Sequence, residues 1–517
     1  MRAHEAGALH GDLGTRGPAW LRSPADVNAL VPHLWPRTVT RAPSGELTVG
    51  GMSVRTLAAE YGTPAYVLDE EDLRARCRDF AAAFAGADVY YAGKAFLCRA
   101  VVRIIAEEGL FLVVCSGGEL AVALRAGFPP ERIGFHGNNK STSELERAVD
   151  AGVGRIVVDS FDEIERLSDI AEKTGTRPGV LLRVTVGVEA HTHEFIATAH
   201  EDQKFGFSLA GGAAFAAALK ILDEGKLDLN GLHSHIGSQI FDTSGFEVAA
   251  RRVLELQAAI RDARGVELSE LDLGGGFGIA YTTQDDPAAP GDLAKHLNKI
   301  VEDECELASL AKPRLSVEPG RAIVGPAALT LYEVGTVKDV DGIRTYVSVD
   351  GGMSDNIRTA LYDASYSATL AGRRSDAEAL LTRVVGKHCE SGDIVVKDEF
   401  LPADVSPGDL LAVPGTGAYC RSMASNYNHV PRPPVVSVRD GVSSTIVRRE
   451  TEEDLLRLDI PALVIPGRDA AHATSAARYL EECLPRADYW DVPVAEQTEA
   501  TVPARMLEFL DRVGAAG

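Results

Sequence analysis

The 517-residue sequence predicts an α/β protein in which a (β/α)8 barrel is followed by an antiparallel β-domain. About eight short apolar runs between Val89 and Arg321 alternate with helix-like amphipathic stretches, and polar residues gather directly after the runs. After Ala322 strand-like runs continue, separated by Gly, Asp and Pro, with no crossover helices between them. An open, doubly wound sheet is the alternative to the barrel, and the number of runs favours the barrel.

Before the barrel, the sequence predicts a short strand, a helix and a second strand. The first strand, between Leu47 and Val54, is expected to pair with the later β-domain and to make that domain discontinuous. The helix is expected from Ser53 to Tyr61, and the second strand from Ala65 to Leu68. Asp69 follows and is suited to cap the next helix, because its carboxylate can accept hydrogen bonds from the first turn.

The apolar runs are the predicted barrel strands. The first, Val89 to Tyr91, is rich in β-branched and aromatic residues and is broken by Gly93. The runs begin at Val89, Phe111, Arg132, Arg155, Val180, Leu229, Glu270 and Arg314. In such barrels the active site lies at the carboxyl ends of the strands, so the polar residues there predict one site. They are Lys94, Cys115, Ser116, His136, Asn138, Asp159, Ser160, His233, His235, Glu318 and Arg321.

Lys94 lies where the first run ends and a helix-like stretch begins. A lysine amine held in a partly dry barrel mouth can lose its proton and attack a carbonyl carbon. A solvated lysine in a surface loop is the commoner alternative.

The segment LDLGGGFG, from Leu271 to Gly278, follows the seventh run. Its three consecutive glycines allow backbone N–H groups to approach an anion closely, as in phosphate-binding loops. The spacing is not that of the dinucleotide-binding fingerprint. A tight turn also needs glycines, but the place between the seventh and eighth runs favours a phosphate site.

Three further motifs carry reactive groups. HSHIGSQ contains His233 and His235, for which a core histidine is the alternative to a ligand-binding one. No carboxylate or thiol spacing nearby completes a metal site, so no metal is expected. EPGR contains Glu318, which can pair with a protonated pyridine nitrogen or form a structural ion pair. HCESGD places Cys389 beside Glu390, where a buried, inert cysteine is the alternative.

Composition and charge exclude several classes of protein. The net charge of −23 argues against binding to nucleic acid or to anionic membranes. The seven cysteines are widely spaced and form no CxxC motif, which is typical of reduced thiols in a cytosol. The N-terminus lacks the apolar core of a secretion signal, and no apolar run is long enough to span a membrane. We therefore expect a cytoplasmic protein.

Together the motifs YAGKAF, HGNNK, HSHIGSQ, LDLGGGFG, EPGR, HCESGD and GAYC resemble the diaminopimelate decarboxylase family. The resemblance extends from about Leu30 to about Leu458, with the motifs in the family's order. It implies an enzyme of fold type III that uses pyridoxal 5′-phosphate (PLP), and a homodimer whose active sites lie at the interface. The implied reaction is decarboxylation of meso-2,6-diaminopimelate to L-lysine, the last step of lysine biosynthesis.

The resemblance also implies a role for each matching residue. Lys94 would form a Schiff base with PLP, His235 would stack on its ring, and Glu318 would face its pyridine nitrogen. Cys389 would be the proton donor, and Glu390 would recognise the distal amino group. The other implied cofactor-binding residues are Ser238, Gly274, Gly275, Gly276, Pro319, Gly320, Arg321 and Tyr419. The other implied substrate-binding residues are Arg321, Arg358, Tyr362 and Tyr419. The segment His191 to Gly206 resembles the family's mobile active-site loop.

The chain departs from the family after Leu458. The remainder predicts the order strand, helix, strand, helix and resembles the end of an α/β-hydrolase, with Asp469 at the position of the acid. The histidine expected between Val492 and Gln497 is missing, and the chain contains no GxSxG, so a non-catalytic appendage is predicted. The predicted units are 1–29 (mobile segment), 30–62 (strands joining the β-domain), 63–321 (barrel), 322–458 (β-domain) and 459–517 (appendage).

Three other functions share features with these motifs. An ornithine or arginine decarboxylase has the same fold, but Glu390 and the paired arginines favour a substrate with a second amino-acid head. Alanine racemase also combines a barrel, a β-domain and a PLP lysine, and HSHIGSQ together with HCESGD argues against it. A non-catalytic regulator is disfavoured because Lys94, Glu318 and Cys389 are all present.

Overall fold

The computed structural model describes residues 17–187, 204–341, 343–451, 462–466, 477, 486–498 and 500–514. The chain divides into two compact units. The larger unit comprises residues 1–424 and 433–447, and the smaller unit comprises residues 425–432 and 448–517.

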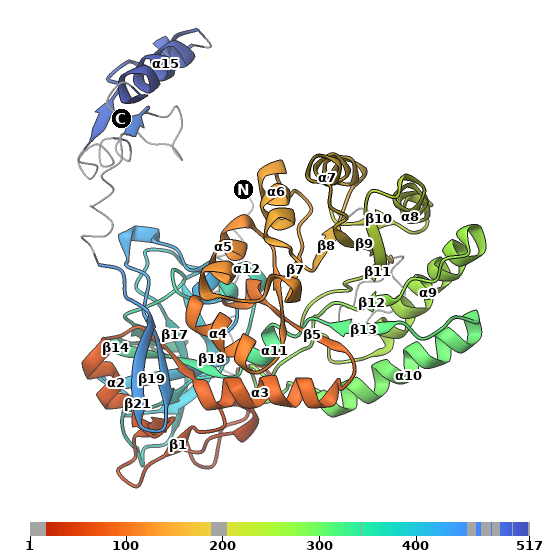
Figure 1. Cartoon of the computed structure of the whole chain (residues 1–517). Helices are drawn as coiled ribbons and strands as arrows, with labels where there is room; N and C mark the ends of the chain where they lie inside the picture. Colours follow the sequence, from red (N-terminus) through yellow and green to blue (C-terminus); the bar gives the residue numbers. More distant parts are fainter. Residues whose placement is uncertain are drawn as a thin grey trace. The chain divides into compact units, whose positions relative to one another are not determined.

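The larger unit contains the predicted parallel barrel (Figure 1). Its eight strands are β5 (Asp88–Ala92), β6 (Phe111–Val114), β7 (Ile133–Phe135), β8 (Arg155–Val158), β9 (Gly179–Thr185), β11 (Asp228–His233), β12 (Glu270–Asp272) and β13 (Arg314–Val317). They pair in the order β9–β11–β12–β13–β5–β6–β7–β8, and a parallel pairing of β8 with β9 closes the ring. The short strand β10 (Phe207–Ser208) pairs with β9. All eight predicted strands are confirmed, and the open sheet is excluded.

Helices follow the strands and surround the barrel. They are α4 (Arg99–Glu107), α5 (Gly117–Ala126), α6 (Thr142–Ala151), α7 (Phe161–Thr174), α8 (Ala213–Glu224), α9 (Ser244–Arg264) and α10 (Pro290–Ala308). After β13 comes only the short α11 (Arg321–Val324), and α3 (Glu70–Ala83), which precedes the barrel, packs between α10 and α4 instead. The eighth helix of the ring is therefore supplied from the N-terminal side.

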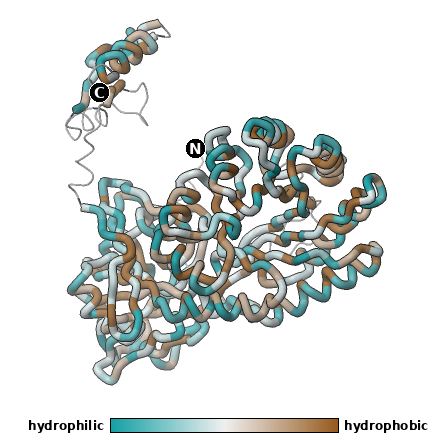
Figure 2. The backbone as a smooth tube through the Cα atoms, in the orientation of Figure 1, coloured by the Kyte–Doolittle hydropathy of each residue, from teal (hydrophilic) through white to brown (hydrophobic). Residues whose placement is uncertain are grey.

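Local sequence signals explain where these helices begin and end. Asp69 caps α3 by accepting a hydrogen bond from Asp72 N–H, as predicted. Ser141 and Glu144 form a reciprocal capping box at α6, and Gly152 ends that helix in a left-handed conformation. Apolar residues lie along the strands and the inward faces of the helices, whereas hydrophilic residues cover the outside (Figure 2).

The second sheet of the larger unit is the β-domain. Its later strands are β14 (Ala328–Val340), β15 (Arg344–Val349), β16 (Thr369–Leu370), β17 (Ala379–Val385), β18 (Ile394–Pro402), β19 (Leu410–Pro414), β20 (Val435–Arg439) and β21 (Val442–Val447). Most pairings are antiparallel, as predicted, but β15–β17 and β4–β20 are parallel. The long connection from β15 to β17 contains α12 (Arg358–Tyr362) and β16, and it returns the chain to the same end of the sheet.

The N-terminal strand of this sheet differs from the expected one. The strand β4 (Ala65–Asp69) lies between β14 and β20 and pairs with both. The segment from Leu47 to Val54 instead belongs to a separate small sheet of β1 (Thr40–Arg41), β2 (Leu47–Val49) and β3 (Met52–Ser53). This segment forms no ladder with the described strands of the β-domain, but Leu47 N–H donates a hydrogen bond to Ala371 O (2.8 Å) and Gly441 N–H donates one to Gly50 O (2.7 Å). That residues 30–62 join the β-domain stays a prediction. The predicted helix follows as α2 (Val54–Tyr61), with Ser53 as its N-cap.

Of the segment 1–29, for which the sequence predicts mobility, residues 1–16 lie outside the described residues. Near its end, the buried Asn28 side chain donates a hydrogen bond to Ser375 O (2.7 Å) and accepts one from Ser375 N–H (2.9 Å).

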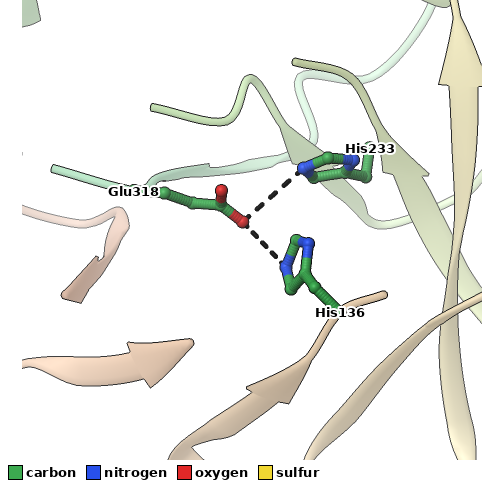
Figure 3. A group of neighbouring side chains, drawn as sticks. All are labelled: His136, His233 and Glu318. Atoms are coloured by element: carbon green, nitrogen blue, oxygen red, sulfur yellow. Dashed lines mark ion pairs between the residues drawn. The ribbon is translucent and has the colours of Figure 1, made fainter. Parts of the chain in front are cut away.

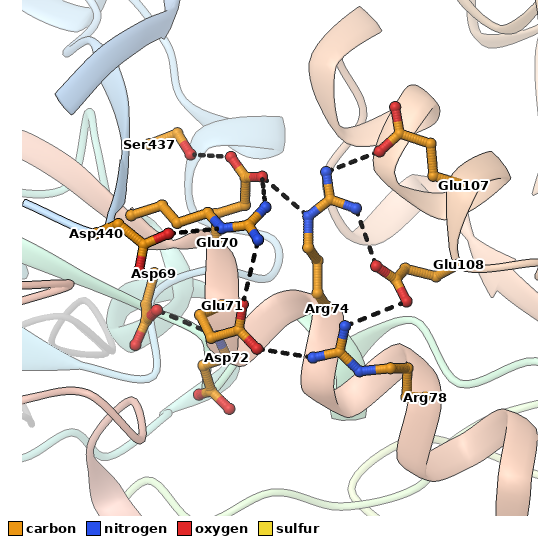
Figure 4. Close-up of polar contacts among 11 residues, drawn as sticks. Asp69, Glu70, Glu71, Asp72, Arg74, Arg78, Glu107, Glu108, Ser437 and Asp440 are labelled. Carbon is orange, nitrogen blue, oxygen red and sulfur yellow. Dashed lines mark hydrogen bonds and ion pairs between the residues drawn. The ribbon is translucent and has the colours of Figure 1, made fainter. Parts of the chain in front are cut away.

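Ion pairs on α3 connect the barrel to the β-domain (Figure 4). Arg74 forms ion pairs with Glu70 (2.9 Å) on α3 and with Glu107 (2.8 Å) and Glu108 (2.9 Å) at the end of α4. The Glu70 carboxylate also accepts a hydrogen bond from Ser437 on β20 (3.1 Å). A network of several charges holds its geometry better than an isolated surface pair.

The described residues of the smaller unit include β22 (Ala462–Val464), β23 (Ala487–Tyr489) and α15 (Thr501–Gly514). The two strands pair in parallel, as a strand–helix–strand connection requires. Arg505 on α15 pairs with Asp488 on β23 (2.8 Å). The helix predicted between the strands is not assigned because most of it, like Asp469, lies outside the described residues. None of the helices that the structure describes is long and apolar enough to cross a membrane.

Candidate active site

Two adjoining cavities lie at the carboxyl end of the barrel strands. One has a volume of about 50 Å³ and the other about 710 Å³. Both are lined by Lys94, Ser238, Arg321 and Tyr419. The small cavity also contacts His235, Glu318 and the glycine loop, whereas the large one contacts Arg358 and Tyr362.

Lys94 lies on the 3-10 turn Gly93–Ala95, directly after β5. The neighbouring Ala95 carbonyl accepts hydrogen bonds from Tyr419 N–H (2.8 Å) and from Ser422 Oγ (2.9 Å). Tyr419 has a φ of +63°, which is costly for a residue with a side chain and is common at functional sites. The β-domain thus holds Tyr419 beside the turn that carries Lys94.

The glycine loop after β12 is closely packed against its neighbours. A Cβ atom on Gly275 would lie 2.3 Å from Glu318 O, and one on Gly276 would lie 2.4 Å from Gly237 O. Gly276 also has a φ of +102°, which favours glycine. The glycines therefore allow the loops after β11, β12 and β13 to meet, with backbone bordering the small cavity.

Glu318, which follows β13, lies within reach of two histidines, His136 and His233 (Figure 3). Its Oε1 is 2.9 Å from His136 Nε2 and 3.5 Å from His233 Nε2. Burial alone would raise the pKa of Glu318, but the two histidines hold it well below its usual range. Glu318 is therefore an anion inside the barrel mouth.

His235 lines the small cavity beside Lys94. Burial, and secondly the Lys94 charge, lower the pKa of His235 well below its usual range. Its imidazole is therefore neutral and presents a flat ring to the cavity.

Two arginines border the large cavity. Arg321 donates hydrogen bonds to Tyr281 Oη (2.5 Å) and to Ser238 Oγ (2.8 Å). Arg358, which is 5% exposed, donates to Tyr281 Oη (2.8 Å) and Tyr366 Oη (2.6 Å). Among the residues that the structure describes, neither guanidinium forms an ion pair with a carboxylate. The two guanidinium groups therefore attract an anion strongly at this place, although the chain as a whole is acidic.

Three predicted site residues are exposed, and two of them lie apart from this cluster. Tyr362 reaches the edge of the large cavity but is 60% exposed. Cys389 and Glu390 are exposed in the β-domain and line neither of the two cavities. Their loop is anchored through His388, whose Nε2 is 2.8 Å from Ser354 Oγ. Within one chain, the structure does not bring Cys389 to Lys94.

The group of residues around the small cavity fits PLP. The glycine loop, Ser238 and Arg321 offer backbone and side-chain donors for a phosphate, in a cradle that a Cβ atom would fill. The buried Glu318 anion offers an acceptor for a protonated ring nitrogen, and Lys94 offers an amine for an aldehyde. Pro319 and Gly320, also predicted to contact the cofactor, line the same cavity.

Three residues at this site had no individual role in the sequence prediction, and two of them, Tyr281 and Asp272, were not among the predicted site residues. His136 contacts Glu318, and Tyr281 contacts both arginines. Asp272 accepts a hydrogen bond from Gly274 N–H (2.7 Å), and burial together with the Glu318 charge raises the pKa of Asp272 to about 7. The strand-end position of His136 placed it in the predicted site, and the position of Asp272 at the end of a strand could have suggested it in the same way. No sequence signal identifies Tyr281.

Two further predictions remain open. Most of the proposed loop, His191 to Gly206, lies outside the described residues. His136, His233 and Glu318 offer ligand atoms within 4.8 Å of one another, a spacing that a cation could use. The sequence predicts no metal, and that stays a prediction.

Comparison with known proteins identifies similar chains. Residues 70–325 match the family model described as pyridoxal-dependent decarboxylase, pyridoxal binding domain. The chain is 58% identical over 443 residues to diaminopimelate decarboxylase of Mycobacterium tuberculosis, covering 83% of this chain and 98% of that one. It is 56% identical to the Mycobacterium leprae enzyme, covering 89% and 100%. A crystal structure of diaminopimelate decarboxylase from M. jannaschii with L-lysine has a TM-score of 0.77 at 31% identity, covering 83% and 98%.

Proposed function

The chain belongs to the diaminopimelate decarboxylase family, and we propose that it converts meso-2,6-diaminopimelate into L-lysine and CO2 with PLP as cofactor. The observation that carries this proposal is the arrangement of Lys94, Glu318 and the glycine loop around the small cavity. Beside it lie two arginines that form no ion pair with any carboxylate in the described part of the chain. Curated relatives with this name reach 48–58% identity, which favours this reaction over an ornithine or arginine decarboxylase.

Bound PLP supplies an aldehyde that joins amines and a ring that accepts electrons from the reacting carbon. We propose that Lys94 is the amine that holds the cofactor and that His235 packs its neutral ring against it. The Glu318 carboxylate keeps the ring nitrogen protonated, because an anion beside it favours the charged form. The glycine loop and Ser238 bind the phosphate.

The substrate has two amino-acid heads of opposite configuration, and L-lysine retains the L-configured one. CO2 therefore leaves the D-configured carbon, while the distal L-head must be bound elsewhere. We propose that Arg321 and Arg358 bind its carboxylate, with Tyr362 and Tyr419 beside them. Glu390 would pair with its ammonium group, because a carboxylate is the natural partner for that charge.

We propose a homodimer in which Cys389 and Glu390 of each chain complete the partner's site. Both residues are exposed and lie away from the cavities of their own chain. Cys389 would then deliver the proton that replaces CO2. We also propose a cytoplasmic location and no nucleic-acid binding. The six described cysteines are free thiols, and the net charge is −23.

The proposed reaction is tested by measuring CO2 release from purified, PLP-loaded protein. We expect release from meso-diaminopimelate, with L-lysine as product, and kcat/KM values far lower for ornithine and arginine. These two lack a distal carboxylate, so the arginine pair would remain without its anion. Equal or greater turnover of ornithine would contradict the proposed substrate.

The C-terminal appendage is predicted to be dispensable for catalysis. It lacks a GxSxG nucleophile and the hydrolase histidine, so truncation after Leu458 should leave kcat and KM within a few-fold of the full-length values. The assay is steady-state decarboxylation, with the dimer checked by light scattering. Loss of activity in a truncated protein that still dimerises would show that the appendage supports the site.

A further inference from the structure

Tyr281 occupies a central position between the two arginines. It lies in the loop between the glycine loop and α10, is 5% exposed, and lines the large cavity. The turn that carries it is fixed by Asp285, whose Oδ2 accepts hydrogen bonds from Tyr281 N–H and Thr282 N–H, both 2.9 Å. The tyrosine is therefore held rigidly at the cavity wall.

The hydrogen bonds of its phenol oxygen are unusual. The oxygen accepts from Arg321 Nη1 at 2.5 Å and from Arg358 Nη1 at 2.8 Å. A phenol oxygen has two acceptor positions and one hydrogen, and a guanidinium can only donate. The two arginines thus take both acceptor positions, and the phenol hydrogen cannot point to either of them. No residue that the structure describes accepts a hydrogen bond from it.

This arrangement is suited to one kind of ligand. The Tyr281 oxygen holds two positively charged guanidinium groups close together. Their mutual repulsion is offset when an anion binds between them. The free phenol hydrogen adds a third donor to the same region of the cavity. A carboxylate offers two oxygens with about four lone-pair positions, enough for both guanidiniums and the hydroxyl.

We propose that Tyr281 is a substrate-binding residue that donates its phenol hydrogen to the distal carboxylate of the substrate while it holds Arg321 and Arg358 around that carboxylate. The inference rests on the proposed function, which supplies a substrate with a distal carboxylate. It explains how one site can distinguish a two-headed amino acid from a simple diamine or diamino acid.

Comparing the product with a diamine that lacks its carboxylate separates this role from a structural one. L-lysine retains the distal carboxylate, whereas 1,5-diaminopentane has the same chain and both amines without it. Titration calorimetry with PLP-loaded Tyr281→Phe should show L-lysine binding weakened by about tenfold or more, because a hydrogen bond to a charged group is lost. Binding of 1,5-diaminopentane should stay at the wild-type value. Equal weakening of both ligands, or unchanged L-lysine binding, overturns the proposal.

Kinetics provide a second readout. The distal carboxylate keeps its charge during the reaction, so its contacts are the same in the ground and transition states. Tyr281→Phe should therefore raise KM for meso-diaminopimelate with little change in kcat. A fall in kcat at unchanged KM contradicts the proposal. Thermal melting and cofactor absorbance check that the variant is folded and loaded.

Tyr366→Phe is a matched control. Tyr366 also accepts a hydrogen bond from Arg358 (2.6 Å), but it is 2% exposed and is not among the residues lining the large cavity. Its loss should weaken L-lysine binding clearly less than Tyr281→Phe. If the two variants lose L-lysine affinity equally, Tyr281 acts only by arranging Arg358, and the direct contact is refuted.

The wild-type protein distinguishes failure of this inference from failure of the proposed reaction. Equal affinity for L-lysine and 1,5-diaminopentane overturns the carboxylate site and the role of Tyr281 with it. Absence of CO2 release from meso-diaminopimelate, with the preference for L-lysine and the effect of Tyr281→Phe intact, contradicts only the reaction and supports the site.

Discussion

Replacing Lys94 by alanine is expected to reduce decarboxylation by at least about a thousandfold, because the variant has no amine that can form the covalent link to PLP. Lys94 is the lysine among the residues that line the small cavity beside Glu318 and the glycine loop. The Lys94 side chain is exposed and lines the cavity, so its removal creates no void in the core. Melting temperature should therefore change little.

Borohydride reduction followed by peptide mass spectrometry provides the readout that activity alone cannot. In the wild type, the peptide that contains Lys94 should gain the mass of the reduced cofactor, and in Lys94→Ala no peptide should. Lys94→Arg is the matched control, because it keeps the positive charge beside His235 but cannot form the link; it should be as inactive as Lys94→Ala. Near wild-type turnover in either variant would show that another residue holds the cofactor.

Mixing two inactive variants is expected to restore about a quarter of wild-type activity if sites are shared between subunits. Lys94→Ala lacks the cofactor-binding amine, and Cys389→Ala lacks the proposed proton donor. After random subunit exchange, about half of the dimers are mixed, and each mixed dimer has one site in which both groups are intact. The exposure of Cys389, away from the cavities of its own chain, is the structural reason for this expectation.

The control mixes Lys94→Ala with Glu318→Gln. Lys94 and Glu318 line the same cavity of one chain, so both sites of a mixed dimer remain defective and activity should not recover. Exchange is confirmed with a mass tag on one variant. No recovery in the Lys94→Ala and Cys389→Ala mixture, with exchange confirmed, refutes the shared site and removes Cys389 from the proposed mechanism.

The strands of the barrel could be predicted because their signals are local. Runs such as Phe111 to Val114 are apolar on both faces and are followed by amphipathic helices, and the structure confirms all eight. The strand Ala65–Asp69 shows where such signals stop. The sequence predicts this strand, but its partners, β14 and β20, lie hundreds of residues further along the chain. A buried apolar strand has the same pattern in either sheet, so periodicity cannot choose its neighbours.

By itself the sequence determined that a barrel is followed by a mostly antiparallel sheet, as well as the eight barrel strands and the placement of Lys94, His235, Glu318 and Arg321 at strand ends. These follow from local periodicity and from motifs that stand directly after apolar runs. Only the tertiary structure decided that Tyr281 joins Arg321 to Arg358, that His136 holds Glu318, and that Cys389 lies apart from Lys94 within one chain. Such contacts join segments far apart in the sequence, and their geometry is set by how barrel and β-domain pack together, which no local pattern encodes.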